Sequence, residues 1–234
     1  MKPAIKVLGV PDDINSSFMR GSSAAPPLIR EALYSASSNL FSESGLNLDQ
    51  KGIWEDLGDI EFAGEVAVEN FKKIKTFVKD VLVSNQKLVS LGGDHSVSWP
   101  ILDAHLDIWD ALDILHIDAH PDLYDSLLGN KLSHASPFAR IMETGRASRL
   151  VQVGIRTLNK HQREQAEKFG VEIYQMKDLT KLSSLSFSKP VYCSIDIDAL
   201  DPAYAPGVSH FEPGGLSTRQ LIDCLNGFKG RLIG

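Results

Sequence analysis

The sequence predicts an α/β protein in which helices cover both faces of a parallel sheet. Short apolar runs alternate with amphipathic stretches along the 234 residues. Strands buried on both faces form continuous apolar runs, and parallel strands need crossover connections that are usually helical. No internal repeat, low-complexity tract or linker interrupts the pattern, so we predict one domain over residues 1–234.

The first half of the chain contains three predicted strands and two predicted helices. The strands cover residues 5–10, 53–60 and 87–91. Pro26 and Pro27 favour a helix start over residues 24–33, because proline has no N–H to leave unpaired. The clearest helix is predicted over residues 65–84, where apolar residues recur close to every 3.6 positions.

The second half repeats the alternation and contains five predicted strands. These cover residues 112–117, 150–155, 171–174, 190–197 and 231–233. A polar helix is expected between the second and third of them. A further helix is predicted over residues 217–227, with Ser217 as its cap.

Charge and composition exclude several classes of protein. The net charge of −6 argues against nucleic-acid binding, which needs a basic patch. No run of about 18 apolar residues and no secretory signal is present, so we expect no membrane contact and a cytoplasmic protein. Cys193 and Cys224 form no CxxC pair and are expected to be reduced thiols.

Three segments place carboxylates and histidines directly after predicted strands. They are GGDHS at 92–96, DAHPD at 118–122 and SIDIDALDP at 194–202. Each segment alone has a structural interpretation, as a capped turn or a loop of solvated acids. Ligands of open α/β sheets bind beyond the carboxyl ends of the strands, so we expect the three segments to converge on one crevice.

The three segments together predict a metal site with two ions. Extended backbone directs residues at i and i+2 to the same side. The six candidate ligands are His95, Asp118, His120, Asp122, Asp196 and Asp198. This set exceeds the roughly three ligands of a catalytic zinc and fits two ions about 3.5–4 Å apart. Oxygen and imidazole ligands without thiolate favour Mn²⁺, with Fe, Co, Ni and Zn as alternatives.

These segments resemble the three signature motifs of the ureohydrolase family, which includes arginase and agmatinase. The resemblance extends to SHAS at 133–136, GIR at 154–156 and GVSHFEPGGL at 207–216, covers essentially the whole chain, and is closest to the plant-type arginase/agmatinase branch. It implies a three-layer α/β/α fold with a mainly parallel sheet of the arginase/deacetylase type, two Mn²⁺ per chain and a homo-oligomer, as a trimer or hexamer.

The resemblance also implies a role for each candidate residue. His95, Asp118, Asp122 and Asp196 would hold one Mn²⁺, and Asp118, His120, Asp196 and Asp198 the other. A metal-bridging hydroxide would attack the guanidinium carbon of agmatine or arginine, giving urea plus putrescine or ornithine, as in arginine metabolism and polyamine biosynthesis. Asp122 would orient the hydroxide and take its proton. His134 would protonate the leaving amine, the alternative being a plain surface histidine.

Two departures from the family pattern bear on the substrate and on activity. Tyr124 stands where animal arginases have an asparagine that contacts the α-carboxylate, and residues 156–164 lack an Asp-x-x-Glu pair for an α-ammonium. Both favour agmatine over arginine. The sequence ends at Gly234, so we expect the family's last strand, final helix and guanidinium-binding glutamate to be missing.

Two other functions compete with a ureohydrolase. The first is a catalytically incomplete metal-binding protein that acts as a subunit or regulator of a full-length homologue. The second is a deacetylase with a single zinc, against which the six candidate ligands count. Among the remaining histidines we expect His116 to be a hydrogen-bonded core residue, and His210 to border the crevice at most.

Overall fold

The chain forms two compact units. The computed structural model describes residues 5–179 and 185–234. The first unit comprises the chain up to Ser16, the segment Arg20–Ile108 and Gly234. The second unit comprises Ser17–Met19 and Trp109–Ile233. The single domain over residues 1–234 stays a prediction.

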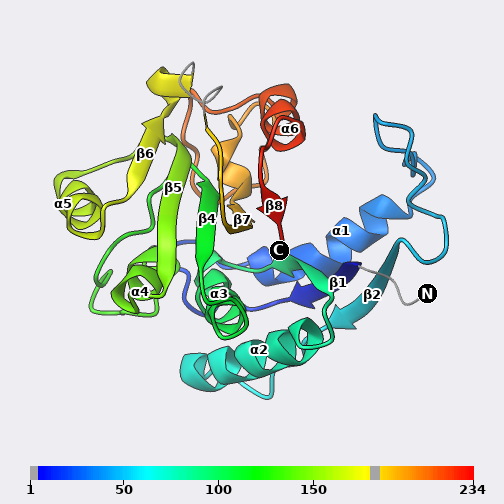
Figure 1. The fold of residues 1–234 in the computed structure, drawn as a ribbon, viewed down its shortest axis with the longest axis horizontal. Coiled ribbons are helices and arrows are strands. Elements are labelled where there is room, and N and C mark those ends of the chain that lie inside the picture. Colours follow the sequence, from blue (N-terminus) through cyan, green and yellow to red (C-terminus); the bar gives the residue numbers. More distant parts are fainter. Residues whose placement is uncertain (1–4, 180–184) are drawn as a thin grey trace. The chain divides into compact units, whose positions relative to one another are not determined.

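The first unit is a three-stranded parallel sheet with helices. Its strands β1 (Ile5–Val10), β2 (Trp54–Asp59) and β3 (Lys87–Gly92) pair in the order β2-β1-β3. Its helices are α1 (Ala25–Leu33), α2 (Ala67–Leu82) and α3 (Ser98–Leu106), with short 3₁₀ turns η1 (Ser22–Ala24) and η2 (His95–Val97). Helices α1 and α2 lie on opposite sides of this sheet (Figure 1).

Within the described residues, the second unit is a five-stranded parallel sheet with three further helices. Its strands are β4 (Leu112–Ile117), β5 (Ala147–Ile155), β6 (Glu172–Gln175), β7 (Pro190–Ile195) and β8 (Arg231–Leu232), in the order β6-β5-β4-β7-β8. Its helices are α4 (Pro137–Glu143), α5 (Lys160–Phe169) and α6 (Thr218–Asn226), with the 3₁₀ turn η4 (Ile197–Ala199). All six residues of the central strand β4 are buried, as expected of a strand covered on both faces.

Local sequence signals set the ends of the helices that follow these strands. The Ser217 hydroxyl accepts from the Gln220 N–H while the Gln220 side chain accepts from the Ser217 N–H, which forms a capping box at the start of α6. The Asn159 side chain caps α5 by accepting from the Gln162 N–H. Helix α5 ends at Gly170, whose φ of 66° favours glycine.

The predicted α/β class with parallel strands is confirmed, and two helices were not predicted. Helix α3 buries residues on all sides, including Ser98, Pro100 and His105, so it has no polar face for a periodicity to show. Helix α4 has seven residues, too few for a clear period, and begins at Pro137. No helix within the described residues is long and apolar enough to cross a membrane.

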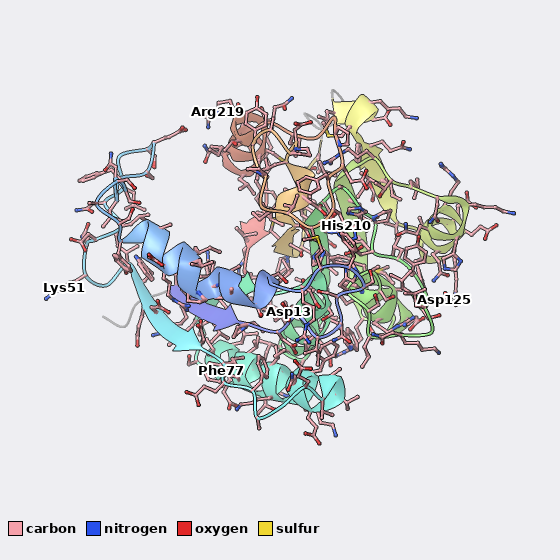
Figure 2. The ribbon with its side chains drawn as sticks, turned by 180° about the vertical axis from the view of Figure 1, so that it is seen from behind. Asp13, Lys51, Phe77, Asp125, His210 and Arg219 are labelled. Atoms are coloured by element: carbon pink, nitrogen blue, oxygen red, sulfur yellow. The ribbon has the colours of Figure 1, made fainter. Side chains whose placement is uncertain are left out.

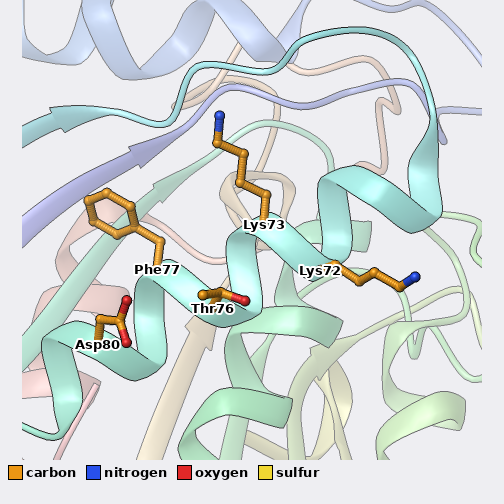
Figure 3. Close-up of a pocket in the computed structure, with 5 residues that line it drawn as sticks. All are labelled: Lys72, Lys73, Thr76, Phe77 and Asp80. Carbon is orange, nitrogen blue, oxygen red and sulfur yellow. The ribbon is translucent and has the colours of Figure 1, made fainter.

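A hollow on the surface of α2 lies apart in sequence from the three motifs. Its lining residues all belong to this one helix and are Lys72, Lys73, Thr76, Phe77 and Asp80 (Figure 3). The Lys73 ammonium donates to the Glu61 carbonyl. None of these residues is a candidate ligand, so we assign the hollow no part in the predicted metal site.

Candidate metal centre

Asp118 and Asp196 occupy equivalent positions beyond two neighbouring strands. Strands β4 and β7 pair in a register that places Ile117 opposite Ile195. Asp118 and Asp196 are the residues that directly follow these two isoleucines. The Asp118 N–H donates to the Val153 carbonyl at 3.0 Å, and the Asp196 N–H donates to the Ile117 carbonyl at 2.9 Å. Sheet hydrogen bonds therefore continue one residue past both strands and fix both aspartates at the carboxyl edge.

Three of the predicted ligands form a compact cluster. One ligand atom from each of Asp118, His120 and Asp198 lies within 4.8 Å of the others. His120 Nδ1 is 3.1 Å from Asp198 Oδ2 and 3.5 Å from Asp118 Oδ1. The same Asp118 oxygen accepts from the His120 N–H at 2.6 Å. The DAHPD segment thus turns back so that its first and third residues meet.

Asp196 and Asp198 are held to each other and to the DAHPD segment. Asp196 Oδ1 accepts from the Asp198 N–H at 3.0 Å, which caps η4. Asp198 Oδ1 accepts from the Ala119 N–H at 3.3 Å. Gly154 also allows a close approach here, because a Cβ on it would lie 3.0 Å from the Asp118 carbonyl oxygen. The two motifs of this unit therefore share one hydrogen-bonded edge.

At Asp198, burial and repulsion by neighbouring carboxylates outweigh the attraction of the His120 imidazole. Burial raises the pKa of Asp198, and repulsion by Asp196 and Asp118 raises it further, to about 8. Burial lowers the pKa of His120, but its contacts with Asp118 and Asp198 outweigh burial and raise it to about 11. The carboxylates of Asp118, Asp196 and Asp198 with the His120 imidazole are a donor set that a divalent cation of the Mn²⁺ type fits.

Asp122 adopts an unusual backbone conformation within the DAHPD segment. Its φ is 49° and its side chain is buried. The left-handed region is uncommon for residues other than glycine, and such strain clusters at functional sites. The conformation is consistent with a functional role for this residue, although its ligation and its catalytic role stay predictions.

His134 contacts a second histidine, His210, which also contacts the cluster. His134 Nε2 is 2.8 Å from the Ser17 hydroxyl oxygen. The ring centroid of His210, labelled in Figure 2, is 5.7 Å from that of His134 and 5.6 Å from that of His120. Burial lowers the pKa of His210, and the His120 charge lowers it further. The predicted proton donor is thus joined to the cluster through one imidazole.

A half-buried arginine, Arg156, holds the loop that carries His210. The Arg156 guanidinium donates to the Glu212 carbonyl from Nη2 at 2.7 Å and from Nε at 2.9 Å, and to the Asp198 carbonyl at 2.7 Å. A Cβ on Gly215 would lie 2.6 Å from the Asp201 backbone nitrogen and 2.7 Å from Arg156 Nη2, so the close backbone approach here requires glycine. Glu212 Oε1 consequently lies 3.5 Å from His120 Nε2.

The six predicted ligands are divided between the two units. Asp118, His120, Asp122, Asp196 and Asp198 belong to the second unit, where the structure groups the first, second and last of them. His95 belongs to the first unit, at the start of η2 directly after β3. The Asp94 side chain caps that turn by accepting from the Ser96 N–H at 2.9 Å. Ligation by each of the six residues stays a prediction.

Sequence reasoning gave too little weight to three residues near the cluster. His116 is buried and hydrogen-bonded as expected, but its partner is the Asp118 carboxylate, 2.7 Å away. His210 and Glu212 both lie against His120. Their position in the segment after the third motif was the available signal. Asp201 fixes the turn that follows the third motif by accepting from the Gly214 N–H at 2.8 Å.

Curated plant proteins match the chain along its whole length. "Arginase 1, mitochondrial" of Oryza sativa subsp. indica is 46% identical, covering 100% of this chain and 73% of the relative. "Arginase 2, chloroplastic/mitochondrial" of Arabidopsis thaliana is 45% identical, covering 100% of this chain and 72% of the relative. Because these similar proteins are named for organelles, the predicted cytoplasmic location is wrong; composition carries no signal that separates an organelle protein from a cytoplasmic one.

The fold and the family agree with these relatives. The solved arginase of Medicago truncatula matches with a TM-score of 0.91 at 43% identity, over 99% of this chain and 77% of that chain. The family model described as "Arginase family" matches residues 3–234. The resemblance seen in the three motifs is therefore confirmed, and the chain belongs to the arginase family of hydrolases.

Proposed function

We propose that this protein is a ureohydrolase that hydrolyses the guanidinium group of agmatine or arginine, giving urea and an amine, with two Mn²⁺ per chain. The observation that carries the proposal is the cluster of Asp118, His120 and Asp198, with Asp196 beside it. Membership of the arginase family supports the reaction class. Plant relatives named as arginases support a substrate of the arginine type.

The chain's own residues suit the two parts of the proposed site. Asp118 and Asp196 lie beyond adjacent strands, where each carboxylate can serve two ions. His120 and Asp198 lie beside Asp118 and complete the donor set on that side. When bound, two divalent ions supply Lewis acidity and an activated water near neutral pH.

Asp122 and His134 supply the proposed proton transfers. The fixed backbone of Asp122 sets the direction of a carboxylate that can accept a proton. His134 Nε2 is held by the Ser17 hydroxyl at 2.8 Å, which positions an imidazole that can protonate a leaving amine. Arg156 acts on neither directly, but it holds the Asp198 and Glu212 backbones.

The substrate and the assembly are also part of the proposal. A small cation suits a cluster rich in carboxylates and a chain of net charge −6. The Tyr124 hydroxyl accepts from the Asn159 amide, and its ring stacks on His161 at 5.5 Å. These residues lie in the two segments whose sequence favours agmatine. We further propose a homo-oligomer, as a trimer or hexamer.

The test combines metal analysis with a urea assay on the whole chain. The purified chain is reconstituted with Mn²⁺, its metal content is measured, and urea release is followed from agmatine and arginine in parallel. We expect two ions per chain and turnover. Asp118→Ala is expected to lose both ions and activity, whereas Asp223→Asn on the exposed surface of α6 is the matched control. Bound metal without urea from any guanidino compound would contradict the proposal.

A further inference from the structure

We propose that His116 is a positioning residue that aims the Asp118 carboxylate, as a neutral imidazole whose protonated nitrogen is selected by Gln152. This inference rests on the proposed metal site and adds a residue that the six-ligand set does not contain. His116 lies on β4 and donates a hydrogen bond to Asp118, but it does not itself bind the metal. The side chains of His116 and Gln152 are 0% exposed.

The sheet register brings these three residues together. His116 on β4 pairs with Gln152 on β5, so both side chains leave the same face of the sheet at the same level. Asp118 is two residues beyond His116 and continues on that face. His116 Nε2 is 2.7 Å from Asp118 Oδ2, and Gln152 Nε2 is 3.0 Å from His116 Nδ1.

The hydrogen-bond network assigns the proton on His116. Gln152 Nε2 is 2.6 Å from the Pro121 carbonyl oxygen as well as 3.0 Å from His116 Nδ1. The terminal atom facing the Pro121 carbonyl must be the amide nitrogen, because two oxygens at that distance would repel. Its second hydrogen then points at Nδ1, which must accept. The imidazole proton therefore sits on Nε2 and is donated to Asp118.

The same proton placement excludes His116 as a metal ligand. A histidine binds metal through an unprotonated ring nitrogen. In His116 one nitrogen carries the proton that Asp118 accepts, and the other accepts from Gln152. Neither nitrogen is left to bind an ion while this network persists.

The network leaves Asp118 oriented and still able to bind metal. Its Oδ2 accepts from His116, and its Oδ1 accepts from the His120 N–H at 2.6 Å. A carboxylate has about four lone-pair sites, so each oxygen keeps capacity for an ion. A hydrogen-bond partner of a ligating carboxylate changes the metal affinity, because it sets the direction of the carboxylate and the charge on its oxygens.

Packing holds the imidazole in the plane that this donation needs. The Phe138 ring stacks on the His116 ring with centroids 3.9 Å apart and planes 28° apart. Gln152 Oε1 is buried and finds no hydrogen-bond partner within the described residues. An unsatisfied amide oxygen costs free energy. The orientation of the Gln152 amide is thus set by the two acceptors of its NH₂ group, His116 Nδ1 and the Pro121 carbonyl, and not by a hydrogen bond to Oε1.

The first test reads the tautomer directly. Long-range ¹H–¹⁵N spectra of the ¹⁵N-labelled, metal-free chain distinguish Nε2–H from Nδ1–H imidazoles. We expect His116 to be the Nε2–H form, and Gln152→Leu to give a mixture of the two forms. An Nδ1–H form of His116 in the unsubstituted chain would overturn the proposal. This readout does not depend on metal binding or activity, so it decides the proposal even if the proposed function fails.

The second test measures Mn²⁺ affinity by calorimetry in a matched pair of variants. His116→Gln keeps an amide N–H close to the position of Nε2, whereas His116→Asn is too short to reach Asp118. We expect His116→Asn to bind Mn²⁺ about 10–100-fold more weakly, the loss typical of such partners, and His116→Gln to recover most of it. Melting curves of each metal-free variant check folding.

His105 supplies the control for changing a buried histidine. It is 0% exposed and donates from Nδ1 to the Ile101 carbonyl at 2.9 Å within α3. His105→Asn is expected to keep the Mn²⁺ affinity within about threefold, well short of the effect of losing a ligand's partner. A folded His116→Asn chain with unchanged Mn²⁺ affinity, or equal losses in the Asn and Gln variants, would overturn the proposal.

Discussion

Buried aspartates follow parallel strands in both units, but Asp13 of the first unit and Asp198 of the second have their carboxyl pKa shifted in opposite directions. In the first unit, Asp13 follows β1 and accepts from the Gly21 N–H, the Ser23 N–H and hydroxyl, and the Arg20 guanidinium. Burial alone would raise its pKa, but these donors together hold the pKa of Asp13 below its usual value. This carboxylate is neutralised within the unit.

In the second unit, Asp118, Asp196 and Asp198 lie close together, with His120 beside Asp118 and Asp198 and His116 beside Asp118. Repulsion adds to burial there, and the pKa of Asp198 rises to about 8. The number of acids beyond a strand therefore does not identify a metal site. A metal site is better identified by comparing the carboxylates with the local donors and positive charges. Only a cluster whose carboxylates lack enough of these is stabilised by binding a cation.

Asp118→Ala gives the largest expected effect. Asp118 contacts His116 and His120, and the proposed assignment lets it serve both ions. We expect Mn²⁺ affinity to fall by more than about 100-fold, beyond the loss caused by an outer partner. Elemental analysis after dialysis checks the result. Retention of two ions per chain in this variant would refute the bridging role.

Mn²⁺ itself should stabilise the chain in a way that depends on the second unit's acids. At a concentration 100 times its Kd, a ligand adds about 2.7 kcal/mol to the free energy of unfolding. For a chain of this size we expect the melting temperature to rise by roughly 5–10 °C. Asp198→Asn should abolish most of the rise. An equal rise in that variant would place the bound ion elsewhere.

Strands, the long helix and the motif segments followed from the sequence because each has a strong local signal. β1 and β4 have the predicted bounds, and Ser217 caps α6 as expected. Helices α3 and α4 did not follow, since one is buried on all sides and the other is short.

Within the candidate site, sequence reasoning located the acids but not what surrounds them. The contact between His116 and Gln152 depends on the pairing of β4 with β5, and that of His210 with His120 depends on a loop held by Arg156. Partners set by strand register and loop packing are not encoded within any one segment.

Asp13→Ala should separate stability from metal binding. It leaves the backbone N–H groups of Gly21 and Ser23 without their acceptor, the buried Asp13 carboxylate. We expect the free energy of unfolding to fall by roughly 1.5–3 kcal/mol, the contribution of hydrogen bonds to a charged group. Denaturant unfolding measures the loss, and calorimetry should show unchanged Mn²⁺ affinity. A large drop in affinity would mean that the contrast between Asp13 and the cluster does not hold.

The smallest expected effect concerns the buried histidine of the first unit. Burial lowers the pKa of His105 to about 4, whereas the unfolded chain keeps the ordinary value of 6.5. Protons therefore bind the unfolded chain more readily, and the His105 contribution is full above about pH 6.5 and is lost as the pH falls toward 4. Between pH 7 and 5 this loss should be roughly 1–2 kcal/mol.

His105→Asn isolates that contribution, because asparagine keeps a donor near Nδ1 and does not titrate. The unfolding free energy of each chain is measured without metal at both pH values. We expect the advantage of the unsubstituted chain over the variant to shrink on acidification by that amount. If the difference in unfolding free energy stays constant, protonation of His105 does not destabilise the folded chain. The imidazolium would then be paired with a carboxylate, as His120 is with Asp198.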